Sequence, residues 1–96
     1  MRRVVKTKFP VSPLISDLTV LGAAIRASRT EAGMTMLEAA MVLNLTAKTL
    51  ADIELGKPSV SLGSALKVAR GFGLALFVVH DADKQLTLNA LQRTSE

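Results

Sequence analysis

The chain has 96 residues, which is enough for one domain but leaves no room for a catalytic domain beside a binding domain. Cysteine is absent, and this excludes disulfide bonds, thiolate metal sites and cysteine nucleophiles. Apolar residues make up 49% of the chain, enough for a hydrophobic core, and twelve basic against eight acidic side chains give a net charge of +4 at pH 7.

The excess of positive charge lies at the amino-terminal end. Four basic side chains stand there in a stretch without acidic residues: Arg2, Arg3, Lys6 and Lys8. These four equal the whole net charge, so the rest of the chain is formally neutral. Residues 1–13 are therefore predicted to form a basic arm, which is either a solvated, flexible terminus or a segment that lies along a polyanion.

Neither an export signal nor a membrane span is expected. Lys6 and Lys8 interrupt any apolar run near the start of the chain, and no small-residue cleavage pattern follows. The longest unbroken apolar run, residues 74–79, is far shorter than the roughly 18 to 20 residues that cross a bilayer. We therefore expect a soluble, cytoplasmic protein without membrane contacts.

The first predicted helix follows the arm. Ser16 or Asp17 can cap it, because both side chains accept hydrogen bonds from free backbone N–H groups. Its apolar positions repeat at helical spacing: Leu18, Leu21, Ala24 and Ile25. Gly33 is expected to end this helix, since glycine adopts the left-handed conformation that commonly follows a helix.

Two short helices joined by a tight turn are predicted next. Thr35 and Glu38 have the spacing of a capping box, so a helix is expected over about residues 36–43. Asn44 can adopt the left-handed conformation that a tight turn needs. Thr46 can cap a third helix, which the next glycine ends. This pattern predicts a helix-turn-helix, and a plain helical bundle with caps at the same places is the alternative.

A fourth helix and a strand complete the predicted elements. Ser61 can cap a helix that ends before Gly71 and Gly73. The apolar run at 74–79 then predicts a strand, followed by a turn at 81–84 and a weaker strand at 85–88. Because a lone hairpin has unpaired edges, we expect the same strand of a second subunit to pair with it in a two-fold homodimer. The expected dimer contacts are Leu74, Leu76, Phe77, Val78 and Val79.

The predicted architecture is therefore mainly α. It divides into the arm at residues 1–13, a helix-turn-helix domain at 14–73, the dimerisation strand and turn at 74–88, and a tail at 89–96.

No group of residues indicates catalysis, a metal site or a cofactor. His80 is the only histidine, and the two aspartates near it lie in the predicted turn. Gly71 and Gly73 are only a fragment of a dinucleotide-binding motif, without the strand that must precede it. Asp52 and Glu54 lie two positions apart on a helix and cannot face each other. We therefore expect no enzymatic activity, and we expect the Asp52 side chain to be solvated.

The motif residues between positions 18 and 73 resemble those of one known family. The chain has, in the family's order, Arg26, Arg29, Gly33, Thr35, Ala40, Thr46, Leu50, Ile53, Glu54, Gly56, Leu62, Lys67, Ala69, Phe72 and Gly73. With this pattern it resembles the phage-repressor (Cro, XRE) DNA-binding domains. The resemblance implies a lambda-repressor-like fold of four to five helices, with a short C-terminal strand that pairs across the homodimer. It also implies that Glu54 pairs with Arg26 or Arg29 inside the domain.

The same resemblance implies which residues contact DNA. Thr46 would begin the recognition helix, whose exposed side enters the major groove. Lys48 would donate to guanine or to a phosphate, and Thr49 would contact a base. The expected DNA contacts are Thr35, Met36, Thr46, Ala47, Lys48, Thr49, Asp52, Lys57 and Ser59, with Arg2, Arg3, Lys6 and Lys8 of the arm. Met36, where the family has Gln, and Ala47 cannot make bidentate base contacts, which leaves more of the readout to phosphates, operator shape and dimer spacing.

A helix-turn-helix followed at once by an apolar strand and an acidic turn resembles the HipB-type antitoxins. Those proteins pair C-terminal strands between subunits, bind operator palindromes and hold a HipA-type serine/threonine kinase toxin. The resemblance implies a homodimeric repressor that binds double-stranded palindromic operator DNA, autoregulates its operon and inhibits a HipA-like toxin. Two alternatives stay open: a stand-alone transcriptional regulator of the same fold, and a protein-binding antitoxin with little affinity for DNA.

Overall fold

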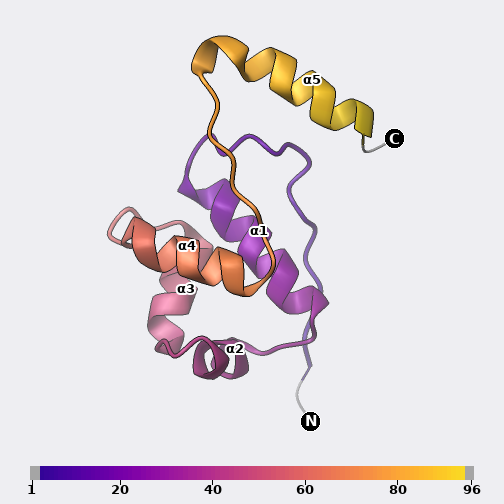
Figure 1. Cartoon of the computed structure of the whole chain (residues 1–96). Coiled ribbons are helices and arrows are strands. Elements are labelled where there is room, and N and C mark those ends of the chain that lie inside the picture. Colours follow the sequence, from indigo (N-terminus) through magenta and orange to yellow (C-terminus); the bar gives the residue numbers. More distant parts are fainter. Residues whose placement is uncertain (1–2, 95–96) are drawn as a thin grey trace.

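The computed structural model describes residues 3–94 and is helical (Figure 1). Arg2 and residues 95–96 lie outside the described range. The elements are α1 (Leu18–Glu31), α2 (Met36–Val42), α3 (Ala47–Leu55), α4 (Leu62–Gly71), a short 3-10 helix η1 (Asp81–Asp83) and α5 (Lys84–Thr94). The helix-turn-helix prediction is confirmed, since α2 and α3 are joined by a turn of residues 43–46.

Each of the first four helices begins at a predicted cap. The side chains of Asp17, Thr35, Thr46 and Ser61 accept hydrogen bonds from backbone N–H groups two or three positions further on. Glu38 completes the capping box, because its Oε1 accepts from the Thr35 N–H at 2.8 Å. Asn44 has a positive φ of 58°, as the tight turn requires. The local signals in the sequence therefore determined where these helices begin.

The core lies where the first four helices meet. It consists of Leu21 and Ile25 from α1, Ala39 and Ala40 from α2, Leu50 and Ile53 from α3, and Ala65, Val68 and Ala69 from α4. About half of these side chains are alanine, so the helix backbones approach closely and no aromatic ring is needed to fill the centre.

Two glycines permit the closest approach, between α1 and the end of α3. A Cβ atom on Gly22 would overlap the backbone carbonyl of Glu54. Gly56 follows α3 with a φ of +71°, and a Cβ atom there would lie 2.6 Å from the backbone nitrogen of Thr19. The backbones of α1 and α3 are therefore in direct contact, which fixes the position of α3 in the domain.

We predict that Gly22→Ala destabilises the fold by about 1–3 kcal/mol, because the new methyl group meets backbone atoms that cannot move aside. Urea unfolding followed by far-UV circular dichroism measures this effect, since the chain has no Trp or Tyr. Gly63→Ala is the matched control, because Gly63 lies on α4 with open space where the methyl group would go. The control is expected to gain up to about 1 kcal/mol. A Gly22→Ala variant as stable as the parent chain would contradict the close approach.

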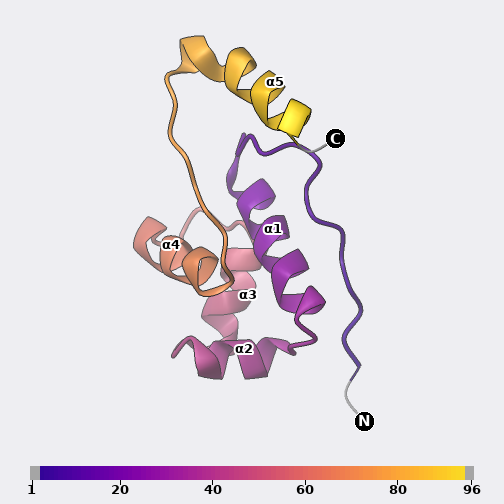
Figure 2. The ribbon, with the colours of Figure 1, turned by 45° about the vertical axis from the view of Figure 1, so that its right-hand side comes forward.

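The amino-terminal segment runs alongside α1, on the side away from α3 and α4 (Figures 1 and 2). The Thr7 N–H donates to the hydroxyl of buried Thr30 at 3.0 Å, and Lys6 Nζ lies 3.7 Å from Glu31 Oε1. Because Thr30 and Glu31 are at the carboxy-terminal end of α1, residues 7–17 follow the helix back to its start. Part of the predicted arm is therefore docked on the domain.

The carboxy-terminal segment differs from the prediction. Residues 74–80 form no strand in the described chain, because no neighbouring strand is there to complete a hydrogen-bonded ladder. The predicted turn at 81–84 is replaced by η1 and the first residue of α5. The strand predicted at 85–88 is wrong, since these residues belong to α5, where good helix formers such as Lys84, Gln85 and Leu86 outweigh a short alternation. α5 also crosses the boundary expected between residues 88 and 89.

Large apolar side chains remain exposed at this end of the molecule. Leu74 and Leu76 pack against the core, but Phe77 and Val78 are 82% and 98% exposed. α5 lies beyond the amino-terminal end of α1, apart from the first four helices (Figures 1 and 2). Its Leu86 side chain is also exposed. The apolar residues of the segment after α4 are therefore only partly buried, at Leu74 and Leu76.

Candidate nucleic-acid interface

A buried ion pair holds α3 against α1. Arg29 Nε donates to Glu54 Oε2 at 2.6 Å and Arg29 Nη2 donates to Glu54 Oε1 at 3.0 Å, so the pair is bidentate. Arg29 Nη1 also donates to the carbonyl oxygen of Met34 at 2.9 Å. Of the two arginines considered for Glu54, Arg29 is the partner, and Arg26 is exposed. This single side chain therefore links α1, the turn before α2, and α3.

Arg29→Met is expected to destabilise the domain by roughly 3–5 kcal/mol, because it leaves the Glu54 carboxylate buried without its counter-charge. Urea unfolding followed by circular dichroism measures the loss. Arg26→Met removes the same charge one turn earlier on α1, from an exposed side chain, and should change stability by no more than about 0.5 kcal/mol. Equal effects of the two substitutions would mean that the ion pair has no special role.

The outer face of α3 carries a cluster of three charged side chains. Lys48 Nζ lies 2.9 Å from Asp52 Oδ2, and Lys57 Nζ lies 3.2 Å from Asp52 Oδ1. We call Lys48, Asp52 and Lys57 the Lys–Asp–Lys cluster. The Lys48 side chain is 80% exposed, whereas that of Asp52 is 19% exposed. Asp52 is expected from the sequence to be solvated; its side chain is partly exposed, and a lysine engages each of its carboxylate oxygens.

The lysines also change the protonation chemistry of Asp52. The hydrogen bond from Lys48, followed by that from Lys57, lowers the pKa of the Asp52 carboxyl below its ordinary value. Asp52 is therefore ionised at neutral pH, and the cluster has a net charge of +1. The sequence indicates the contact between Lys48 and Asp52, because the two positions have the i,i+4 spacing of a helical ion pair. The contact between Lys57 and Asp52 is not indicated by spacing, because Lys57 lies beyond the left-handed turn at Gly56.

Two threonine hydroxyls lie at the amino-terminal end of the same helix. Thr46 Oγ1 accepts from the Thr49 N–H at 3.1 Å and donates to Thr49 Oγ1 at 2.9 Å. This leaves the hydroxyl hydrogen of Thr49 available to an external acceptor. The first turn of α3 contains no acidic residue, so the backbone N–H groups there attract an anion without competition.

Several other predicted contact residues take part in core packing or helix capping. Met36 and Ala47 are partly buried and pack against the core. The Thr35 hydroxyl accepts from the Glu38 N–H at 3.2 Å, and the Glu38 carboxylate is bonded at this helix end. Ser59 is exposed in the turn after α3. Of the predicted set, the structure thus brings together Thr46, Lys48, Thr49, Asp52 and Lys57 on or beside the exposed side of α3.

Comparison with known families decides what kind of domain this is. A family model described as helix-turn-helix matches residues 25–78, which is more than half of the chain and includes α2, α3 and α4. The chain belongs to the helix-turn-helix family. The match supports the phage-repressor (XRE) type that the motif residues resemble, and with it a role in binding DNA. A search of curated proteins found no match. In the described part of the chain, no helix is both long enough and apolar enough to cross a bilayer.

The arm of this helix-turn-helix chain is not beside α3. Its backbone runs along the side of α1 that is turned away from α3 and α4 (Figure 2). Lys6 faces Glu31, and Arg3 and Lys8 are exposed. Arg2 lies outside the described residues. The docking of Thr7 on Thr30 has no signal in the sequence, because the two residues are 23 positions apart.

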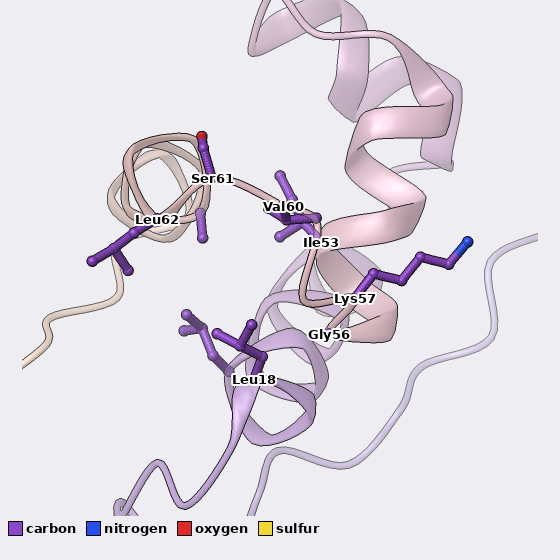
Figure 3. Close-up of a pocket in the computed structure, with 9 residues that line it drawn as sticks. Leu18, Ile53, Gly56, Lys57, Val60, Ser61 and Leu62 are labelled. Atoms are coloured by element: carbon purple, nitrogen blue, oxygen red, sulfur yellow. The ribbon is translucent and has the colours of Figure 1, made fainter.

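A pocket of about 80 Å³ lies between the start of α1, the end of α3 and the start of α4 (Figure 3). Leu18, Ile53 and Val60 line it, whereas the Lys57 side chain extends away from it (Figure 3). Ligand-binding pockets usually have roughly 300–1,000 Å³, so this one is too small. The polar groups that remain accessible to a ligand are the charged and hydroxyl side chains on the exposed face of α3.

Proposed function

We propose that this chain is a sequence-specific DNA-binding transcriptional repressor whose recognition helix is α3. The observation that carries the proposal is the division of α3 into two faces. Leu50, Ile53 and Glu54 are buried against the domain, whereas Lys48 and Thr49 are left on the other side with donors available. An α-helix fits the major groove of B-DNA, where such donors meet base acceptors and phosphates.

The double substitution Lys48→Ala with Thr49→Ala should abolish sequence-specific binding. The loss of two base contacts is expected to weaken binding to the operator by roughly 100-fold or more, since each good contact contributes about 1–3 kcal/mol. Fluorescence anisotropy with duplexes from the region upstream of the chain's own gene, against competitor DNA, measures the affinity. Lys67→Ala is the charge-matched control, because Lys67 is exposed on α4. If the double variant still selects the operator, α3 is not the recognition helix.

We also propose that the repressor is a homodimer formed through residues 74–79. Support comes from the exposed Phe77 and Val78 side chains and from the extended backbone of this segment, whose hydrogen-bonding groups suit pairing with a second copy. A two-fold axis would present two α3 helices about 34 Å apart, one DNA turn, to a palindromic operator.

Val78→Asp is expected to convert the dimer to monomers, because a charge between the paired apolar segments would be buried without a partner. Multi-angle light scattering gives the mass of the species. Val42→Asp, at another exposed valine at the end of α2, is the control and should leave the mass unchanged. A dimer that persists in Val78→Asp would refute this interface.

The finer proposal is that the repressor is the antitoxin of a HipA-like kinase toxin and autoregulates their shared operon. Its support is the resemblance to HipB-type antitoxins, carried by an apolar segment and an acidic stretch directly after the helix-turn-helix. A kinase-like reading frame next to this one would support the antitoxin role. Its absence would favour the alternative, a stand-alone XRE-type regulator.

A second candidate is a protein-binding module with little affinity for DNA, free of enzymatic activity and cofactors. The observation that favours it is the outer face of α2, where Leu37, Met41 and Val42 are all exposed and apolar. DNase footprinting of the chain's own upstream region separates the two candidates. A protected operator supports the repressor, and a region without protection supports the protein-binding module.

A further inference from the structure

The Lys–Asp–Lys cluster places a hydrogen-bond donor and an acceptor side by side on the exposed face of α3. Lys48 and Asp52 are one helical turn apart, and Lys48 Nζ lies 2.9 Å from Asp52 Oδ2. A repressor that needed only phosphate contacts would gain nothing from an acidic side chain here, because a carboxylate repels phosphates. Phosphate binding alone therefore does not account for an acidic side chain between two lysines on this face.

We propose that Lys48 and Asp52 together recognise one G·C base pair, with Lys48 on the guanine and Asp52 on the cytosine, while Lys57 holds the carboxylate in place. This inference rests on the proposed function and goes further, because it names the base pair that α3 selects.

The edges of the base pairs in the major groove favour this assignment. Guanine presents two adjacent acceptors, N7 and O6, to which a lysine amino group can donate. Cytosine presents only the N4 amino group, which donates to a carboxylate. A carboxylate that faced thymine O4 or guanine N7 would meet another acceptor and be repelled. Adenine also presents a donor, N6, but its adjacent N7 acceptor repels a carboxylate, whereas cytosine has no acceptor there. Asp52 therefore penalises other bases as well as binding cytosine, which is how specificity is commonly obtained.

Lys57 gives the acidic side chain a fixed position. It lies 3.2 Å from Asp52 Oδ1, so Oδ2 is the oxygen that pairs with Lys48. Because Lys57 comes from the turn after α3, the carboxylate is held from both ends of the helix's exposed face. A side chain that is already ordered loses less conformational entropy on binding. The lysines also keep Asp52 ionised, as an acceptor for the cytosine amino group must be.

Selection from a library of randomised duplexes, followed by sequencing, tests this inference with the full-length chain. The parent chain is expected to enrich a motif with one strongly preferred G·C pair in each half-site. Asp52→Asn should keep the rest of the motif but lose discrimination at the cytosine, from roughly tenfold to less than about threefold, because an amide both donates and accepts. Asp83→Asn is the control, since it removes the same charge from exposed η1 and should enrich the parent motif. Lys48→Ala should weaken the preference for guanine at the same base pair.

The outcomes separate this inference from the proposed function. An Asp52→Asn variant that selects the parent motif, or that binds all sequences more weakly by an equal factor, would overturn the role of Asp52 in reading a base. Loss of preference at different base pairs in Asp52→Asn and Lys48→Ala would overturn their action on one pair. A parent chain that enriches no motif would refute sequence-specific binding itself, and the inference with it. Thermal unfolding by circular dichroism verifies that each variant is folded.

Discussion

The bidentate pair between Arg29 and Glu54 sets the position of the helix on which the proposed function depends. Both side chains are buried, and each would be costly without the other, so the orientation of α3 relative to α1 has one strongly favoured solution. Arg29 Nη1 also donates a hydrogen bond to the carbonyl oxygen of Met34, in the turn before α2. One guanidinium thus joins α1 to the turn before α2 and to α3, whose Glu54 is 25 positions further along the chain.

The buried residues of α3 are all on its inner face, so the outer face is not needed to pack the helix against the domain. Thr49, Lys48 and Asp52 make no contact that the core needs, and their hydrogen bonds are with other groups on the same surface. The turn that ends the helix at Gly56 also returns Lys57 to this surface. The buried contacts of α3 and its proposed DNA contacts thus lie on opposite sides of a helix of nine residues.

The sequence predicted the parts of the fold that depend on local signals. Caps such as Thr35 and Thr46, and the left-handed Asn44, act within a few residues and are visible in the chain. The docking of the arm on Thr30 and the contact of Lys57 with Asp52 depend on tertiary structure, so spacing alone did not reveal them. An apolar run of six residues does not distinguish a strand from an extended connection. The acidic stretch before α5 indicated a turn, although acidic residues also favour the start of a helix.

The glycine contact between α1 and α3 also limits how this protein can adapt to DNA. Where backbone meets backbone at Gly22 and Gly56, there are no intervening side chains whose rotamers could absorb a tilt of one helix against the other. The two helices should therefore meet an operator as one rigid body. In the proposed homodimer, any mismatch between the spacing of the half-sites and the spacing of the two α3 helices would then have to be accommodated by bending or twisting the duplex, whose stiffness depends on its sequence.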